Sequence, residues 1–453
     1  SALLWRLSLV QLGLAAAALI QESGKARGSA LDGLEGSGAT VDVSRPLSCL
    51  RLTTPGLELR YPEDAEAHME EIRSALRPWQ ALNVYGRRDP RTHARPKIYY
   101  SEHQWMTFYL TWREQKGNGS KLSDVFGPYV PIFTHWVWPW FNHWEGKPKF
   151  QYPKEFLETL RKVLRKDVPY VTVSQNDEGI VGKRCDNLTL AEFPNVLVFS
   201  AGGYGHVPVP LWQQLPDDSD SEVMFKVPNY PRPQRLYFLS YVGSFLHAPR
   251  NMRNRTMDTI AEWSTAHGLK VTHEPDLLLY KLNILRAMKE NWEDPDPVVQ
   301  FPETEAKVVF YHNSSRQDKA MWQEIMFSSR FSLTPRGFGR TSYHMVEIMW
   351  AGLIPIHVYT DQPWLPYRKI FDTFGFHTDV AGLPTLLDRL RSMTDEEFKA
   401  REARVRAHFE SHWMPQRMAG QLFRFMSGRD PFTNETGTGD LICQRLPKTV
   451  TDA

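Results

Sequence analysis

The sequence predicts an α/β fold built on parallel β-sheets. Short, almost uninterrupted apolar runs recur from about residue 97 onward, and helical stretches separate them. Strands covered on both faces read as continuous apolar runs, and helical crossovers between them imply a parallel sheet. With 453 residues, 42% of them hydrophobic, the chain can form two mid-sized domains. The predicted strands are KIYY at 97, PYVTV at 169, NVLVFS at 195, LYFLSYV at 236, LKVT at 269, RFSLT at 330 and IPIHV at 354.

The N-terminal residues predict entry into the secretory pathway. Residues 7–20 contain no charge, which fits the core of a signal peptide better than a full membrane span. We assign residues 1–20 to a signal peptide or a short signal anchor, with a buried helix as the alternative. The expected location is the ER or Golgi lumen, as a single-pass type II membrane protein if an anchor is retained. Five Asn-x-Ser/Thr sequons favour the lumen as well: Asn118, Asn187, Asn254, Asn313 and Asn434.

Charge and cysteine content exclude several classes of protein. Lys and Arg number 54 against 52 for Asp and Glu, so the net charge of +2 argues against a nucleic-acid partner. Cys49, Cys185 and Cys443 form no Cys-x-x-Cys pair. The sequence therefore contains no cysteine motif for zinc and is not that of a disulfide-dense scaffold. One disulfide with one free thiol is compatible with this count.

Local signals divide the chain into segments. Residues 21–94 begin rich in Gly and Ser and are predicted to be a stem or linker that contains a helix over 64–76. The Pro-dense PNYPRP at 228–233 separates a domain over 95–232 from one over 233–430, with a tail over 431–453. Thr394 and Glu397 have capping-box spacing before a further helix.

The segment between the last two predicted strands has the pattern of an anion site. The strand that ends at Thr334 leads into a Gly-containing turn, and Thr341 or Ser342 can cap the next helix. Backbone N–H groups, the positive end of the helix and guanidinium groups would then converge on one point, which suits a diphosphate. Glu347 could accept hydrogen bonds from ribose hydroxyls. An ordinary turn with solvated arginines fits the spacing equally well. The turn contains Arg336, Gly337, Gly339 and Arg340.

This block resembles the C-terminal signature of the exostosin family, glycosyltransferase family 47. In that family a Pro-x-Gly turn is followed by Ser-x-Arg-x-x-Glu, then Gly-x-Ile-Pro, Asp and Leu-Pro. The sequence departs from the pattern at His344, where the family has Arg. Residues 241–253 (YVGSFLHAPRNMR) resemble another turn of the family and would direct Arg250, Arg253 or His247 at the diphosphate. The matching residues of the signature are Pro335, Gly337, Ser342, Glu347, Gly352, Ile354, Pro355, Asp361, Leu365 and Pro366.

The resemblance implies a GT-B architecture, with two Rossmann-like domains facing a cleft, and an inverting transfer from a nucleotide-sugar. The donor would be a UDP-sugar and the acceptor a glycan or glycoprotein, without a metal or other cofactor. The resemblance is also compatible with a dimer, formed with a second copy of the chain or with a related transferase. The donor would contact Arg250, Arg253, Arg336, Gly337, Arg340, Thr341, Ser342, His344 and Glu347.

Two loops that resemble the N-terminal half of the family supply the candidate bases. An in-line displacement needs a base beside the acceptor hydroxyl. Residues 171–180 contain Asp177 and Glu178, and residues 195–212 contain His206; each follows a predicted strand. A turn-capping role is the alternative for each of them.

Other motifs are given structural interpretations. The Asp-x-Asp triplets at 218–220 and 294–296 follow no apolar strand and are predicted to be solvated loops rather than metal sites. The aromatic run at 135–144 is assigned to the core in preference to a sugar platform. The alternative function is a non-catalytic carbohydrate-binding or scaffolding partner, which His344 at the usual Arg position would favour.

Overall fold

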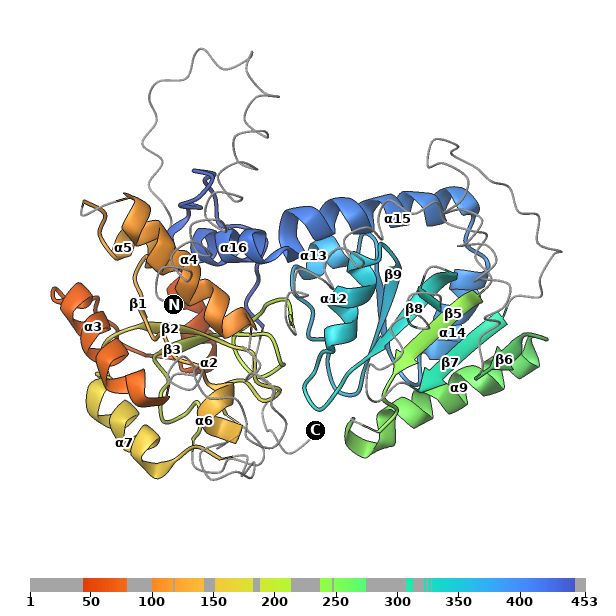
Figure 1. The fold of residues 1–453 in the computed structure, drawn as a ribbon, viewed down its shortest axis with the longest axis horizontal. Helices are drawn as coiled ribbons and strands as arrows, with labels where there is room; N and C mark the ends of the chain where they lie inside the picture. Colours follow the sequence, from red (N-terminus) through yellow and green to blue (C-terminus); the bar gives the residue numbers. More distant parts are fainter. Residues whose placement is uncertain are drawn as a thin grey trace, which may run out of the picture. The chain divides into compact units, whose positions relative to one another are not determined.

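The computed structural model describes most of the chain between residues 44 and 444 (Figure 1). The leading apolar segment, both Asp-x-Asp triplets, the Pro-rich boundary, Cys185, His247 and three of the sequons lie outside the described residues. Within the described part, no helix is long and apolar enough to cross a membrane. The described residues are 44–79, 100–116, 119–141, 151–181, 188–212, 237–246, 248–273, 307–312, 322, 325–326 and 328–444.

The first sheet is four-stranded and parallel, in the order β1-β2-β3-β4. The predicted strands at 169 and 195 are confirmed as β2 (Tyr170–Ser174) and β3 (Val196–Ser200), and every residue of both strands is buried. Their near-continuous apolar sequences are therefore those of strands covered on both faces. The edge strands β1 (Val130–Pro131) and β4 (Val207–Pro208) are too short to have been predicted.

The predicted strand at 97 is wrong where it can be checked. Tyr100 begins helix α4 (Tyr100–Lys116), while residues 97–99 lie outside the described part. Trp105, Tyr109 and Trp112 are buried along this helix. Their spacing of four and then three residues is that of one helix face, and it outweighs the β-propensity of the run before it.

The second sheet is six-stranded and parallel, in the order β10-β9-β8-β5-β7-β6. It confirms the four remaining predicted strands and the α/β class with parallel sheets. Because all strands run the same way, their carboxyl ends share one edge. The strands are β5 (Tyr237–Gly243), β6 (Lys270–Thr272), β7 (Lys307–His312), β8 (Ser329–Pro335), β9 (Ile354–Tyr359) and β10 (Phe376–Asp379).

The helices around the second sheet confirm the predicted starts. The Thr394 side chain accepts a hydrogen bond from the Glu397 amide (3.2 Å), which caps α15 as the capping-box spacing predicts. A π-helical turn, Phe409–Trp413, follows α15 directly. The helices are α9 (Met252–Ala266), α12 (Tyr343–Trp350), α13 (Arg368–Phe371), α14 (Leu383–Arg391) and α15 (Asp395–His408).

Helix α16 (Pro415–Ser427) belongs to the layer of the first sheet although it comes last in the chain. Figure 1 shows this blue helix beside the orange α4 and α5 (Ser123–Phe126), and contacts join it to both. The rings of Phe126 and Phe423 lie 5.7 Å apart, and those of Phe199 and Phe425 lie 5.4 Å apart. The C-terminal segment therefore completes the core around β3.

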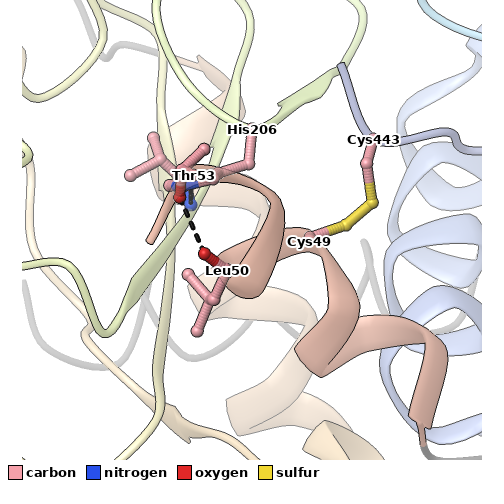
Figure 2. Close-up of a disulfide and its surroundings, with 6 residues drawn as sticks. Cys49, Leu50, Thr53, His206 and Cys443 are labelled. Carbon is pink, nitrogen blue, oxygen red and sulfur yellow. Dashed lines mark hydrogen bonds between the residues drawn. A yellow bond between two sulfur atoms is a disulfide. The ribbon is translucent and has the colours of Figure 1, made fainter. Parts of the chain in front are cut away.

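The helix predicted over 64–76 is confirmed as α3 (Ala65–Leu76), but parts of the predicted stem and tail belong to the core. Helices α2 (Ser44–Thr53) and α3 bury side chains in the main core, among them Leu50 and Ile72 at 0% exposure. Near the other end, Leu441 is also fully buried. A disulfide joins Cys49 of α2 to Cys443, with the two Cα atoms 5.7 Å apart (Figure 2). Polar composition predicts a stem and a tail in these segments, because it does not reveal the few apolar residues that anchor them.

The aromatic run at 135–144 forms core where it is described. Trp136 and Trp140 are 1% and 4% exposed, and the Trp136 indole donates to the Thr172 hydroxyl on β2 (2.8 Å). Trp140 lies in the short helix α6 (Val137–Phe141), and α7 (Lys154–Val163) follows it in the chain. The core interpretation is confirmed for these two residues.

Candidate functional site

Loops from the two sheets meet at the turn that follows β8. The Arg340 amide donates to the Gly202 carbonyl (2.8 Å), and the Trp364 indole donates to the Ser200 carbonyl (2.9 Å). Gly203, at φ +138°, lies so close to Arg340 that a β-carbon would collide with its backbone and side chain. A β-carbon on Gly339 would collide with the Gly202 carbonyl and come within 3.1 Å of the Asp177 Cα. Glycine is therefore required on both sides of this contact.

Arg336 lies inside the turn rather than on its surface. Its guanidinium donates to Thr360 Oγ1 (2.6 Å), Asp361 Oδ1 (3.1 Å) and the carbonyls of Phe338 (3.1 Å) and Gly339 (3.0 Å). The side chain is 0% exposed. The sequence predicts that Arg336 binds a diphosphate, but its N–H groups donate to protein atoms instead. Its role is to fix the shape of the turn.

Arg340 is likewise turned inward. Its Nε donates to Asp361 Oδ2 (2.8 Å), its Nη2 pairs with the same carboxylate, and the guanidinium lies 4.2 Å above the Tyr204 ring. Burial opposes ionisation of Asp361, but the charges of Arg340 and Arg336 outweigh it and hold its pKa below the usual value. The prediction that Arg340 faces a diphosphate is therefore corrected. A single carboxylate, 21 and 25 residues downstream, holds both arginines.

The start of α12 retains features of an anion site. Ser342 is the N-cap, and its hydroxyl accepts from the His344 amide (3.3 Å). The His344 imidazole is 7% exposed, and its Nδ1 lies 3.3 Å from Glu347 Oε2. Its Nε2 is buried and has no hydrogen-bond partner among the residues that the structure describes. A buried polar nitrogen in this state is suited to a ligand group at the helix terminus.

Gly337 and Thr341, the other predicted residues of the turn, have structural positions within it. The Gly337 amide donates to the Thr341 carbonyl (3.0 Å), so this N–H is used within the turn. Thr341 is 6% exposed and does not cap the helix. Of the two expected caps, Ser342 alone fills the role.

Arg253 places a buried positive charge behind the site. It is 7% exposed, and its guanidinium donates to the carbonyls of Ser244 (2.6 Å), Arg336 (3.0 Å) and Pro335 (3.5 Å). Burial lowers its pKa, against the opposing effects of Tyr241 and Asp177. Because these hydrogen bonds go to neutral carbonyls, the charge still contributes a positive potential at the turn. Arg253 also ties the connection after β5 to the end of β8.

Arg250 precedes α9 on the connection from β5, the strand beside β8. It is exposed and adopts a left-handed backbone conformation with φ 52°. Few residues other than glycine adopt this conformation, and it often marks a functional site. Arg250 is therefore an exposed cation on the connection at the carboxyl end of β5, the strand beside β8.

Asp177 and Glu178 lie in the turn after β2 and are half-buried. The Asp177 backbone is the part of this turn that packs against Gly339. Behind the turn, the fully buried Glu102 of α4 accepts from the Gln175 amide (2.9 Å). Burial raises the pKa of Glu102 to about 8, against the backbone hydrogen bonds that favour its ionised form. Sequence reasoning missed Glu102, since nothing in a helical segment marks one glutamate as buried.

His206 lies on the inner side of its loop and is not placed to act as a base. Its Nδ1 accepts from the Val198 amide (3.1 Å), and its Nε2 lies 3.5 Å from Thr53 Oγ1 of α2 (Figure 2). The residue is 3% exposed, and burial lowers its pKa to about 4. The prediction of a catalytic role is corrected, because the ring fastens the loop to the core.

The buried ring of His206 predicts an acid-sensitive contribution to stability. The unfolded chain takes up a proton on this ring near pH 6.5, whereas the folded protein does so only near pH 4. The free energy of unfolding should therefore fall as the pH drops from about 6.5 to 4. Urea unfolding across this range should show a smaller fall in His206→Gln than in the wild type. Equal slopes for the two proteins would contradict the assignment.

Among the described residues, no group of three or more His, Cys, Asp or Glu side chains could hold a metal ion. The candidate site comprises Ser342, His344 and Glu347 at the start of α12, Arg250 and Arg253 at the start of α9, and Asp177 and Glu178 on the loop that meets the turn.

Comparison with known proteins gives a partial match. No family model matches the chain. Over 101 residues the chain is 30% identical to a probable glycosyltransferase of Arabidopsis thaliana, a match that spans 21% of each protein. Part of the chain is thus similar to a glycosyltransferase, while membership of the exostosin family stays a prediction.

Three solved structures align over about three fifths of the chain. An α-glucosyltransferase in complex with UDP and a 13-mer DNA is 12% identical over 59% of this chain and 74% of the other, with a TM-score of 0.29. TarM is 10% identical over 59% and 57%, with a TM-score of 0.25. The pneumococcal O-GlcNAc transferase GtfA, with UDP and GlcNAc, is 10% identical over 60% and 56%, with a TM-score of 0.20. At such low TM-scores these alignments say nothing about the site.

Proposed function

We propose that the protein is an inverting glycosyltransferase that moves a sugar from a nucleotide-sugar, a UDP-sugar by preference, to a glycan or glycoprotein. The observation that carries the proposal is the start of α12, where the buried His344 Nε2 has no hydrogen-bond partner among the described residues. It lies at the carboxyl edge of a parallel sheet, where α/β proteins bind nucleotides. The partial similarity to a glycosyltransferase supports the same reading.

The donor diphosphate would lie against the N-terminus of α12. The leaving diphosphate gains negative charge in the transition state, and fixed positive groups beside it lower the barrier. The helix terminus, the exposed Arg250 and the buried charge of Arg253 supply such groups without a metal ion. His344 would donate a hydrogen bond from Nε2 to a phosphate oxygen, while its Nδ1 lies 3.3 Å from Glu347 Oε2.

The acceptor would approach from the loops of the first sheet. Inversion requires the acceptor hydroxyl to attack opposite the leaving diphosphate while a base takes its proton. Asp177 and Glu178 are the carboxylates on the loop that touches the turn after β8, and we propose one of them as this base. His206 is no longer a candidate.

The test is UDP binding measured by calorimetry. Arg250→Ala and Glu347→Gln should each weaken binding about tenfold or more, because a hydrogen bond to a charged group contributes about 1.5–3 kcal/mol. Arg255→Ala is the matched control, since Arg255 is an exposed arginine in the first turn of α9, five residues after Arg250. Activity should persist in a chelator. A wild-type protein that binds no uridine nucleotide would refute the proposal.

A non-catalytic carbohydrate-binding or scaffolding partner, alone or paired with a related transferase, is the second candidate. It is favoured by His344, which stands where the resembling family carries a permanent positive charge. The two functions differ in turnover: the partner would bind glycans and release no UDP from any UDP-sugar. Glycan binding that is unaffected by Arg250→Ala and Glu347→Gln would support the partner.

We also propose that the protein works in the lumen of the secretory pathway. The Cys49–Cys443 disulfide supports this location, because structural disulfides form in oxidising compartments. The Asn434 sequon is exposed in a loop, as is its Thr436. At Asn254, by contrast, the Thr256 hydroxyl is buried and bonded to the Met252 carbonyl (2.9 Å). Mass mapping of the purified protein should find a glycan on Asn434, and an unmodified Asn434 would count against a lumenal location.

A further inference from the structure

The turn after β8 presents one large apolar side chain to solvent. Phe338 is 48% exposed between two glycines of the turn. Single exposed apolar residues are ordinary on protein surfaces, so exposure alone carries no argument. Here the exposed ring belongs to the same turn whose backbone contacts the loops of the first sheet.

The backbone that carries Phe338 is held rigidly. The buried guanidinium of Arg336 donates hydrogen bonds to the carbonyls of Phe338 (3.1 Å) and Gly339 (3.0 Å). Asp361 and Thr360 fix that guanidinium in turn. An aromatic ring on a fixed backbone loses little entropy when a ligand packs against it.

The position of Phe338 favours contact with the acceptor sugar over contact with the diphosphate. The next residue, Gly339, packs against the backbone of Asp177 and Gly202, on the loops that we assign to the acceptor side. The protein groups that we propose to bind the diphosphate, by contrast, lie at the start of α12 and on the connection after β5. Aromatic faces pack against the apolar C–H face of a sugar ring, as polar ligand sites commonly combine aromatic walls with a few polar groups.

We infer that Phe338 is the side chain on which the acceptor sugar packs, and that it selects acceptors with an uninterrupted C–H face. The inference rests on the proposed function and adds a specificity residue to it. A ring that packs on the acceptor contributes to its binding and leaves donor binding unchanged. Its loss should therefore affect the acceptor KM far more than kcat at saturating acceptor.

The test uses methyl β-galactoside, methyl β-glucoside and methyl β-xyloside as acceptor probes, with saturating UDP. Saturation-transfer NMR should show transfer to the C–H protons of one glycoside face in the wild type. Phe338→Ala should weaken binding of that glycoside about tenfold, while Phe338→Tyr keeps it. Leu52→Ala is the control, since Leu52 is a large apolar side chain at 53% exposure on α2, outside the turn. UDP affinity should stay the same in all three variants.

The possible outcomes distinguish failure of this inference from failure of the proposed function. If UDP binds and Phe338→Ala binds the glycoside as well as the wild type, the inference is overturned and the proposed transferase stands. If Phe338→Ala loses UDP binding as well, the ring serves the donor and the inference is also overturned. Absence of transfer to all three glycosides in the wild type counts against it too. A wild type that binds no UDP overturns the function itself.

Discussion

Asp361→Asn should lower the free energy of unfolding by about 3–5 kcal/mol, the usual loss when one partner of a buried ion pair is removed. Asp361 is the carboxylate shared by Arg336 and Arg340, which are 0% and 1% exposed. Asparagine keeps the size of the side chain but leaves two buried guanidinium groups without a countercharge. Urea unfolding monitored by tryptophan fluorescence measures the change.

Asp372→Asn provides the control for this loss. Asp372 forms an ion pair with Arg368 in which the two side chains are 44% and 32% exposed. Solvent screens such a pair, so its loss should cost less than about 1 kcal/mol. If the two variants were destabilised equally, the buried network would not be what holds the turn.

Removal of the Cys49–Cys443 disulfide should have an effect of similar size, about 2–5 kcal/mol. The two cysteines are 394 residues apart in the sequence, so the bond restricts an exceptionally long loop in the unfolded chain. It also lies beside His206, whose carbonyl accepts from the Gln444 amide (2.8 Å) and whose ring approaches Thr53 (Figure 2). Reduction should loosen the loop after β3 as well as lower global stability.

Cys49→Ala/Cys443→Ala, compared with the wild type with and without dithiothreitol, measures this effect. The double variant should match the reduced wild type and should no longer respond to reductant. Cys185→Ser controls for the loss of a thiol. An unchanged unfolding midpoint after reduction would show that the bond does not contribute to stability.

The sequence predicted most strands whose signal is local and repeated, although β7 was missed despite its apolar run VVFY at 308–311. The apolar runs of β2, β3, β8 and β9 have no polar interruption longer than one residue, and their strand character follows from that. The strand β10 is half-exposed along its length and therefore lacked this signal. The helix starts at Ser342 and Thr394 were predictable because a cap depends on residues within one turn.

The errors concern interactions between residues far apart in the chain. The motif placed Arg336 and Arg340 at a helix terminus, where a guanidinium can bind either a ligand or a distant carboxylate. In the folded protein both guanidinium groups pair with Asp361, and the sequence alone does not show that this carboxylate lies close enough to do so. His206 was misassigned for the same reason, because its partner Thr53 lies 153 residues away on a segment predicted to be a linker.

The packing of α16 against the first sheet affects when that part of the protein can fold during synthesis. Phe423 and Phe425 cover Phe126 and Phe199, so a nascent chain that has not yet emerged past residue 415 leaves those rings exposed. Domains generally fold as units during synthesis, and the N-terminal domain folds first. Here the core around β3 can be completed only after Pro415–Ser427 has left the ribosome.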